Sequence, residues 1–497
     1  MAETTDDKLI WFPTQLWIDG KWQPCRSGAS LAVEDPACGR VVAEVPRAGE
    51  SEAHEAVQSA ARAMLGWRRL SPESRSQVLD RIRRTLLENR EPLGRLLVAE
   101  RGATLEQGRA EVDYAAAFFR WYSEEARRIY GRTIPHPDPT RRLRWEYFPI
   151  GVVAAITAWN GPLGLAAKKV AGALAAGCTV VLKPAELTPL SALALAWVTE
   201  RAGLPAGALN VVFGDAPAIG RVLLEHRAVR MVTFTGSTRT GRYLASEAGK
   251  QIKRVALELG GNAPFLVFAD ADLDQAAGDL VWLKTINAGQ VCVTANRILI
   301  ERSIYQPLVA RLVELLKRQR LGPGDDPEVT MGPLIDRRAV DKVKSLVESA
   351  VCAGAIISYQ GEVPDRCQGG YYYPPTLLEG VTSQMQVACE EVFGPVLSVM
   401  PFDTEDQALR LANDTPFGLA AYVYTTNFQR AQRFSEELEA GVVGINDPRP
   451  ITPEAPFGGI KQSGIGREGG AEGLMEFLEG RLIGLRFPGL GENGNLA

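Results

Sequence analysis

GVVAAITAW (residues 151–159) and CTVVLKP (178–184) begin a series of short apolar runs that alternate with stretches of helical character. The series continues with ALNVVFG (208–214), MVTFTGS (231–237) and KRVALELGG (253–261). Val and Ile cluster in these runs, and alternation of strands with helices is typical of a parallel sheet that has helices on both faces. The sequence therefore predicts an α/β fold.

A second series of the same kind runs from about residue 260 to residue 463 and predicts a second α/β unit. Residues 51–130, ahead of both series, have the charged and Ala- or Leu-rich texture of helices. Two segments fall outside these patterns, the Pro- and Arg-rich residues 131–148 and the tail after residue 479. Both are candidates for an arm that makes oligomer contacts, with a surface loop and a frayed end as the alternatives.

The composition argues against several classes of protein. The 497 residues carry a formal net charge of −4, which disfavours a general nucleic-acid binder. The seven cysteines include no C-x-x-C pair and the three histidines are scattered, so we expect neither a disulfide framework nor a metal site. No signal peptide is evident, and the most apolar stretch, residues 150–167, contains Gly-Pro, which favours a buried strand over a membrane span. We expect a cytoplasmic protein without nucleic-acid or membrane partners.

Two residues near the ends of these runs carry reactive side chains. Cys292 lies in KTINAGQVCVTANR (284–297), and a thiolate there would be a nucleophile if its surroundings lowered the pKa of the thiol. A lone cysteine equally fits a small buried hydrophobic residue. Glu258 ends an apolar run before two glycines, and an apolar setting raises the pKa of a carboxyl group toward the range of a general base. An ion-paired glutamate at a strand end is the alternative.

Polar groups also follow two other predicted strands. The carboxamide of Asn160 can donate a hydrogen bond to an oxyanion, although asparagine before Gly-Pro is also common in turns. Gly236 and Ser237 precede a predicted helix, whose first N–H groups could bind a pyrophosphate or simply be capped by the serine. The Gly- and Pro-rich residues 390–396 and 455–470 are either loop punctuation or backbone that approaches a ligand closely.

Together these segments closely resemble the aldehyde dehydrogenase superfamily of the hydrolytic, non-acylating type. The resemblance extends from WIDGKW (17–22) to the C-terminal tail, and its most specific segments are WN (159–160), LKPAE (182–186), FTGS (234–237), ELGG (258–261), GQVC (289–292), EVFGP (391–395) and PFGG (456–459). It implies a Rossmann-like cofactor domain (residues 1–130 and 149–259), an α/β catalytic domain (260–463) and a small β oligomerisation arm (131–148 and 479–497). A homodimer or homotetramer is expected.

The resemblance also implies roles for single residues. Cys292 is similar to the family nucleophile that forms a thioester, Asn160 and the Cys292 N–H to the oxyanion hole, and Glu258 to the base that activates water for hydrolysis. Lys169 and Glu479 fall where proton-relay partners are proposed. The expected cofactor contacts are Trp159, Lys183, Glu186, Gly214, Gly236, Ser237, Glu391 and Phe393. Since a carboxylate at position 186 would repel a 2′-phosphate by about 1 kcal/mol or more, we expect NAD⁺, with NADP⁺ tolerated through Lys183.

The expected substrate pocket departs from the succinate-semialdehyde branch, which several segments otherwise resemble. That branch usually carries arginines where this chain has Lys168 and Ile286, and neither residue offers the bidentate fork that binds a carboxylate. Gly161, where the family often has an aromatic ring, and Gly164 predict a wider tunnel. Its expected apolar lining is Leu165, Ile286, Val291, Val293, Ile451 and Phe457.

We therefore expect a bulky or elongated, largely apolar aldehyde, aromatic or long-chain. One alternative is a semialdehyde dehydrogenase that binds a distal carboxylate through Lys168 and Arg449, although Arg449 also fits a solvated residue at the tunnel rim. The other alternative is a catalytically silent structural protein on the same scaffold.

Overall fold

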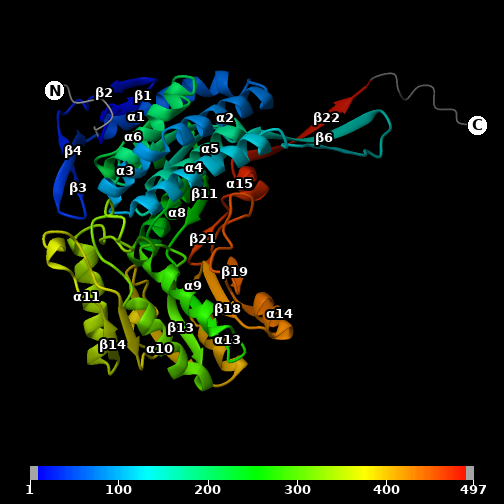
Figure 1. The fold of residues 1–497 in the computed structure, drawn as a ribbon. Coiled ribbons are helices and arrows are strands. Elements are labelled where there is room, and N and C mark those ends of the chain that lie inside the picture. The colour runs from blue at the N-terminus through cyan, green and yellow to red at the C-terminus, as the bar shows by residue number, and fades with distance from the viewer. Residues whose placement is uncertain (1–8, 488–497) are drawn as a thin grey trace, which may run out of the picture.

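In the computed structural model, which describes residues 9–487, two open sheets form the body and a three-stranded arm extends from it (Figure 1). Residues 1–8 of the expected cofactor domain and residues 488–497 of the expected arm lie outside the described residues. No helix within the described part of the chain is both long and apolar enough to cross a membrane.

The first sheet has eight strands in the order β2-β1-β9-β8-β7-β10-β11-β21. The five apolar runs from residue 151 onward form its parallel centre: β7 (Val152–Ile156), β8 (Thr179–Lys183), β9 (Leu209–Val211), β10 (Val229–Thr235) and β11 (Arg254–Glu258). Antiparallel strands extend both edges: β1 (Leu16–Ile18), β2 (Lys21–Gln23) and β21 (Gly464–Ile465). The predicted parallel sheet is confirmed.

The strand order creates a binding edge. From β7 the chain adds β8 and β9 on one side and then returns to add β10 and β11 on the other. The loops after β7 and β10 therefore diverge at the carboxyl ends of neighbouring strands, where open α/β sheets bind their ligands.

Helices cover this sheet on both faces. They are α1 (Glu50–Trp67), α2 (Pro72–Glu88), α3 (Arg90–Arg101), α4 (Leu105–Glu125), α5 (Pro162–Ala176), α6 (Leu190–Arg201), α7 (Ala216–Glu225), α8 (Thr238–Lys250) and α15 (Gly470–Met475). Helix α5 is buried almost throughout, because its Ala- and Gly-rich sequence lets it pack between the sheet and α2 and α4. Its proline at the first turn and a left-handed Gly177 after its end set its bounds.

The second sheet has seven strands in the order β14-β15-β16-β13-β12-β18-β19, parallel except for the edge strand β14. Their bounds are β12 (Ala263–Val267), β13 (Ala295–Glu301), β14 (Ile356–Gln360), β15 (Thr376–Glu379), β16 (Val396–Phe402), β18 (Ala420–Tyr424) and β19 (Val442–Ile445). Its helices are α9 (Leu273–Thr285), α10 (Tyr305–Leu316), α11 (Arg337–Cys352), α12 (Gln386–Cys389), α13 (Glu405–Asn413) and α14 (Phe428–Glu437). Two small ribbons complete the body: β3 (Ser30–Asp35) with β4 (Arg40–Pro46), and β17 (Phe417–Gly418) with β20 (Ile460–Lys461).

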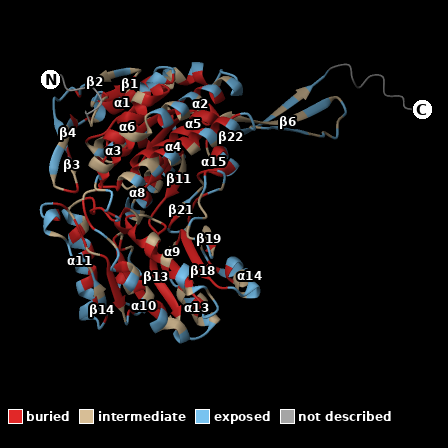
Figure 2. Ribbon diagram, in the orientation of Figure 1, coloured by how far each residue is buried: buried red, intermediate tan, exposed pale blue. Residues whose placement is uncertain are grey.

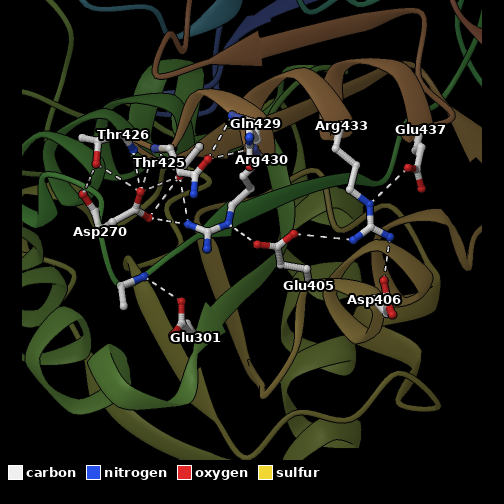
Figure 3. A network of polar contacts seen from close by, with 12 residues as sticks. Asp270, Glu301, Glu405, Asp406, Thr425, Thr426, Gln429, Arg430, Arg433 and Glu437 are labelled. Atoms are coloured by element: carbon white, nitrogen blue, oxygen red, sulfur yellow. Dashed lines mark hydrogen bonds and ion pairs between the residues drawn. The ribbon is translucent and has the colours of Figure 1, made fainter.

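A polar network attaches α13 and α14 to the second sheet (Figure 3). The Asp270 carboxylate accepts hydrogen bonds from the Thr425 hydroxyl and the Thr426 N–H and pairs with Arg430 at 2.6 Å. Arg430 also pairs with Glu405 at 2.8 Å, at the start of α13. Burial alone would raise the pKa of Asp270, but these donors hold it below its usual value. The network fixes the α14 end of the sheet.

The arm consists of β5 (Arg132–Ile134), β6 (Arg141–Pro149) and β22 (Leu478–Arg486), antiparallel in the order β22-β6-β5. It projects from the body, and most of its residues are exposed or half-buried (Figures 1 and 2). Residues far apart in the sequence thus pair into one ribbon whose surface the chain itself leaves uncovered.

Candidate active site

A cleft opens where the carboxyl edge of the first sheet meets the second unit. Residues from both units line it, and they include Trp159, Asn160, Leu165, Lys168, Gly236, Ser237, Glu258, Cys292, Glu391, Phe393, Phe457 and Glu468. The predicted nucleophile, base and oxyanion donor are therefore brought together in one place, from positions up to 132 residues apart (292 minus 160).

The Cys292 loop follows α9 through a tight turn. Asn287, Ala288 and Gly289 have φ values of 49°, 52° and 76°, and a Cβ on Gly289 would lie 2.3 Å from the Gly394 carbonyl oxygen. Glycine is required there both by the left-handed backbone and by this close approach. Cys292 is half-buried, and burial, reinforced by Glu391 and Glu258, raises the pKa of its thiol to about 12. The free protein thus holds a neutral thiol.

Asn160 is fixed from several sides. Its side-chain Nδ2 donates to the Gln290 carbonyl at 3.0 Å, and its own carbonyl accepts hydrogen bonds from Arg101 Nη1 at 3.2 Å and Asn287 Nδ2 at 3.1 Å. The Cys292 loop and the loop after β7 are therefore tied together directly. The amide has a second N–H that can donate to an oxygen in the cleft.

Glu258 ends β11 and is 4% exposed. Among residues 9–487 its Oε2 has no hydrogen-bond partner. Burial and the nearby Glu468 raise the pKa of this carboxyl well above its usual value, with Lys168 and Lys169 opposing. A buried carboxyl with a raised pKa and a free oxygen suits a general base that acts on water near neutral pH.

Two lysines of α5 share the Glu468 carboxylate. Lys169 bonds one oxygen and also donates to the Thr233 hydroxyl at 3.1 Å, while Lys168 pairs with the other oxygen at 3.1 Å. The Lys168 ammonium lies 4.0 Å from the centre of the Phe457 ring. Burial would lower the pKa of Lys168, but Glu468 raises it overall, so this side chain remains a cation.

The structure corrects the expected partner of Lys169. Glu479 lies on β22, half exposed and paired with Arg254 at 3.4 Å, because β22 leads away from the cleft into the arm. Glu468 takes its place beside Lys169. The sequence held a signal for it, since Glu468 is an acidic residue within the Gly-rich segment 455–470, for which close approach to a ligand is one of two interpretations.

The other end of the cleft carries groups that fit a dinucleotide. Gly236 and Ser237 lead into α8, where the Ser237 Oγ caps the helix by accepting the Thr240 N–H at 3.3 Å. The buried Thr238 Oγ1 has no partner within the described residues. A free hydroxyl at a helix N-terminus suits a phosphate. Glu391 accepts the Gly261 N–H at 3.0 Å, and burial raises the pKa of its carboxyl to about 7.

Trp159 and Phe393 meet edge to face, with ring centres 5.5 Å apart, and form an aromatic wall beside Glu391. Lys183 and Glu186 form an ion pair at the carboxyl end of β8, the strand next to β7. Gly214, also expected to contact the cofactor, is required by packing, because a Cβ there would lie 2.4 Å from the Ala48 backbone nitrogen; its contact with the cofactor stays a prediction.

Sequence reasoning missed a fully buried lysine on α9, just before the Cys292 loop. Lys284 lies in the last turn of α9, and its Nζ has no hydrogen-bond partner in the described part of the chain. Burial lowers the pKa of this lysine to about 7, with Glu391 opposing.

On the substrate side, the space beside Gly164 is narrower than the expected wide tunnel requires. A Cβ on Gly164 would lie 3.1 Å from the Tyr114 ring, so α4 fills the space that this glycine leaves. Gly161, the residue before α5, has its Cβ site at an ordinary contact distance of 3.6 Å from Leu165. Val293 is buried, whereas Ile286, Val291 and Ile451 are half-buried. Arg449 is exposed and stacks on Trp282, 3.9 Å from its ring centre. Tyr114 is the residue that sequence reasoning missed here.

This fold and this cleft place the chain in a known enzyme class: residues 22–483 match the aldehyde dehydrogenase family, and the chain belongs to it. It is an oxidoreductase that uses NAD or NADP, as the sequence predicted.

Its relatives include 3-sulfolactaldehyde dehydrogenase of Pseudomonas putida, 46% identical over 479 residues (96% of this chain, 98% of that protein). The NADP⁺-dependent succinate-semialdehyde dehydrogenase of Escherichia coli is 44% identical and covers 94% of this chain and 97% of its own. The structure of betaine aldehyde dehydrogenase from Staphylococcus aureus with NAD⁺ is 35% identical, covers 97% of each chain and superposes with a TM-score of 0.94.

Proposed function

We propose that the protein oxidises a short aldehyde whose far end carries an anionic group, giving the carboxylic acid. The observation that carries this proposal is Lys168, a cation that is 3% exposed, lines the cleft and is held over the Phe457 ring. A buried ammonium with donors left over attracts a carboxylate or sulfonate. The relatives that act on sulfolactaldehyde and succinate semialdehyde support the same class.

This proposal replaces the bulky, apolar aldehyde expected from Gly161 and Gly164. The expected width rested on glycines that leave space, and Tyr114 fills that space beside Gly164. Leu165 and Phe457 make the lining of the cleft partly apolar, so a neutral aldehyde of the same length should also react, only more slowly.

We propose the following chemistry for the residues in the cleft. The Cys292 thiol gives its proton to solvent water and its sulfur adds to the aldehyde carbon, and the new oxyanion accepts hydrogen bonds from the Asn160 amide and the Cys292 N–H. The bound nicotinamide supplies a hydride acceptor, so the carbon is oxidised to the level of a thioester. Glu258 then takes a proton from water, whose oxygen displaces Cys292 and releases the acid.

We propose that Trp159, Glu391 and Phe393 hold the nicotinamide end of the cofactor, that Gly236 and Ser237 hold its pyrophosphate, and that Lys183 and Glu186 hold a ribose. Because Lys183 neutralises part of the Glu186 charge, the discrimination against a 2′-phosphate should be modest. NAD⁺ is thus preferred and NADP⁺ accepted.

We also propose that residues 1–130 and 149–259 act as the cofactor domain and 260–463 as the catalytic domain, and that the arm of residues 131–148 and from 479 onward joins subunits. The arm's exposed apolar side chains, such as Leu482 at 55%, and its unpaired edges support such contacts. A cytoplasmic location is supported by the seven free cysteines.

The test is kcat/KM for matched pairs of aldehydes, with NAD⁺ and with NADP⁺. Succinate semialdehyde and 3-sulfolactaldehyde are compared with butanal, benzaldehyde and cinnamaldehyde, in the wild type and in Lys168→Met. Loss of a charge-assisted hydrogen bond of about 1.5–3 kcal/mol predicts a decrease of roughly 10- to 150-fold for the anionic substrates. Butanal, which lacks the anion, should change far less. Faster turnover of benzaldehyde or cinnamaldehyde than of every anionic aldehyde would contradict the proposal and favour the apolar aldehyde that the sequence predicted.

A further inference from the structure

Arg101 is a buried arginine next to the cleft that the proposed chemistry does not use. It ends α3, is 5% exposed and makes two contacts through its two terminal nitrogens. Nη1 donates to the Asn160 carbonyl at 3.2 Å, and Nη2 pairs with Glu111 at 3.1 Å. Its Nε has no acceptor among the residues that the structure describes. The guanidinium is therefore positioned by these two contacts alone.

Glu111 carries the connection to the helix that holds Lys168 and Lys169. Its Oε1 accepts the backbone N–H groups of Leu163 at 2.9 Å and Gly164 at 3.1 Å, in the first turn of α5. A carboxylate at a helix N-terminus is favourable because it meets free N–H groups and the positive end of the helix dipole. Arg101 and Glu111 thus bracket residues 160–164, with Asn160 at one end.

The same contacts close a ring through the Cys292 loop. The Asn160 amide donates to the Gln290 carbonyl at 3.0 Å, and the Gln290 side chain donates to the Pro333 carbonyl at 3.3 Å. Gly102, the residue after Arg101, has a left-handed φ of 73°, and a Cβ on it would lie 2.5 Å from the Pro333 ring. The Arg101 side chain and the next residue in the chain, Gly102, therefore lie at opposite ends of the path that passes through Asn160 and Gln290.

We propose that Arg101 is a positioning residue for the Asn160 amide: through the Asn160 carbonyl it sets where the side-chain N–H stands relative to Cys292. This inference rests on the proposed role of Asn160 as the oxyanion donor. Donors to a developing oxyanion act only at short range and good angle, and a displacement of about 1 Å can lower a rate by roughly 100-fold. Arginine is needed because its fork reaches both acceptors, whereas a lysine ammonium is a single point contact.

The first experiment measures the single-turnover rate of NADH formation with saturating succinate semialdehyde in Arg101→Met and Arg101→Lys. We expect a decrease of about 10- to 100-fold in Arg101→Met and a smaller one in Arg101→Lys, with the Kd for NADH unchanged. Arg75→Met is the matched control. Arg75 is also buried, at 7% exposure, and donates to the Ala175 carbonyl at 3.1 Å, at the opposite end of α5. Its loss should leave the rate within about twofold. An equal decrease in Arg75→Met would overturn the proposal.

A double-mutant cycle with Asn160→Ala separates positioning from mere stability. If Arg101 acts through Asn160, Arg101→Met should have no further effect on NADH formation in the Asn160→Ala background. If the decreases in rate caused by Arg101→Met and by Asn160→Ala multiply in the double variant, the inference is overturned, while the proposed role of Asn160 is unaffected. An unchanged rate in Asn160→Ala alone would instead overturn the proposed oxyanion donor and the inference with it. If Arg101→Met does not fold, the cycle is measured with Arg101→Lys, and the same outcomes decide.

Discussion

Replacing Lys284 by methionine should stabilise the folded protein at neutral pH, because Glu391 offsets only part of the cost of burying this ammonium. Burial lowers the pKa of Lys284 from its usual 10.5 to about 7. At about 1.4 kcal/mol per pH unit, the difference between these values corresponds to a penalty on the order of 5 kcal/mol. Methionine has a similar length and no charge, so Lys284→Met should remove much of that penalty and raise the Tm.

The sign of the pH dependence follows from where the proton is bound. Between pH 7 and pH 10.5 the unfolded chain carries a proton on Lys284 that the folded chain lacks. The penalty is therefore complete below pH 7, decreases as the pH rises and vanishes above pH 10.5. The advantage of Lys284→Met over the wild type should be largest near neutrality and should shrink toward pH 10.

Scanning calorimetry of both proteins at about pH 7, 8.5 and 10 measures this advantage as a difference in Tm. Lys253→Met is the control. Burial also lowers the pKa of Lys253, to about 8, but its Nζ donates to the carbonyls of His226 and Val229, each at 2.7 Å. Removing this lysine leaves the two carbonyl oxygens without its N–H donors, so Lys253→Met should not stabilise the protein. A Tm gain for Lys284→Met that is absent at pH 7, or that grows with pH, would refute the reasoning.

Three further predictions concern the cleft. Glu258→Gln should keep a burst of one NADH per site and lose steady-state turnover, and stopped-flow absorbance would reveal either the burst or its absence. In the wild type, turnover should rise with pH, because the raised pKa moves the deprotonation of Glu258 to higher pH. Alkylation of Cys292 by iodoacetamide without cofactor should accelerate about tenfold per pH unit toward pH 12, and a rate independent of pH would contradict a raised thiol pKa. Glu468→Gln should lower kcat by tenfold or more by leaving two buried lysines underpaired, whereas Glu479→Gln, on the exposed arm strand, should have no effect; equal kcat values for the two variants would argue against the assignment of Glu468.

The α/β fold followed from the sequence because local patterns encode it. Five apolar runs with Val and Ile became the five parallel strands of the first sheet, and the family assignment and the enzyme class are confirmed as well. Cys292, Glu258 and Asn160 lie together in one cleft, as the resemblance implied; their roles remain a proposal. Each sits at a strand end or a glycine turn, which a sequence marks clearly.

The rest of the site depends on contacts between distant segments. Tyr114 reaches Gly164 from α4, 50 residues earlier in the chain (164 minus 114). The local sequence around Gly164 does not indicate this contact. Glu468 and Glu479 both follow glycine-rich sequence, and only the path of β22 decides which one meets Lys169. The width of a pocket cannot be inferred from its small residues alone, because the neighbouring helix decides whether their space stays empty.

If Lys168 binds the anionic end of the substrate, as proposed, its position makes the cleft selective for substrate length. Lys168 belongs to a helix of the first unit and is clamped between the Glu468 carboxylate and the Phe457 ring, whereas Cys292 is supplied by the second unit. In the proposed binding mode, a substrate that touches both residues spans the gap between the two units. Any movement that opens or closes that gap changes which chain length fits, so the preferred number of carbons reports how far apart the two units stand during turnover.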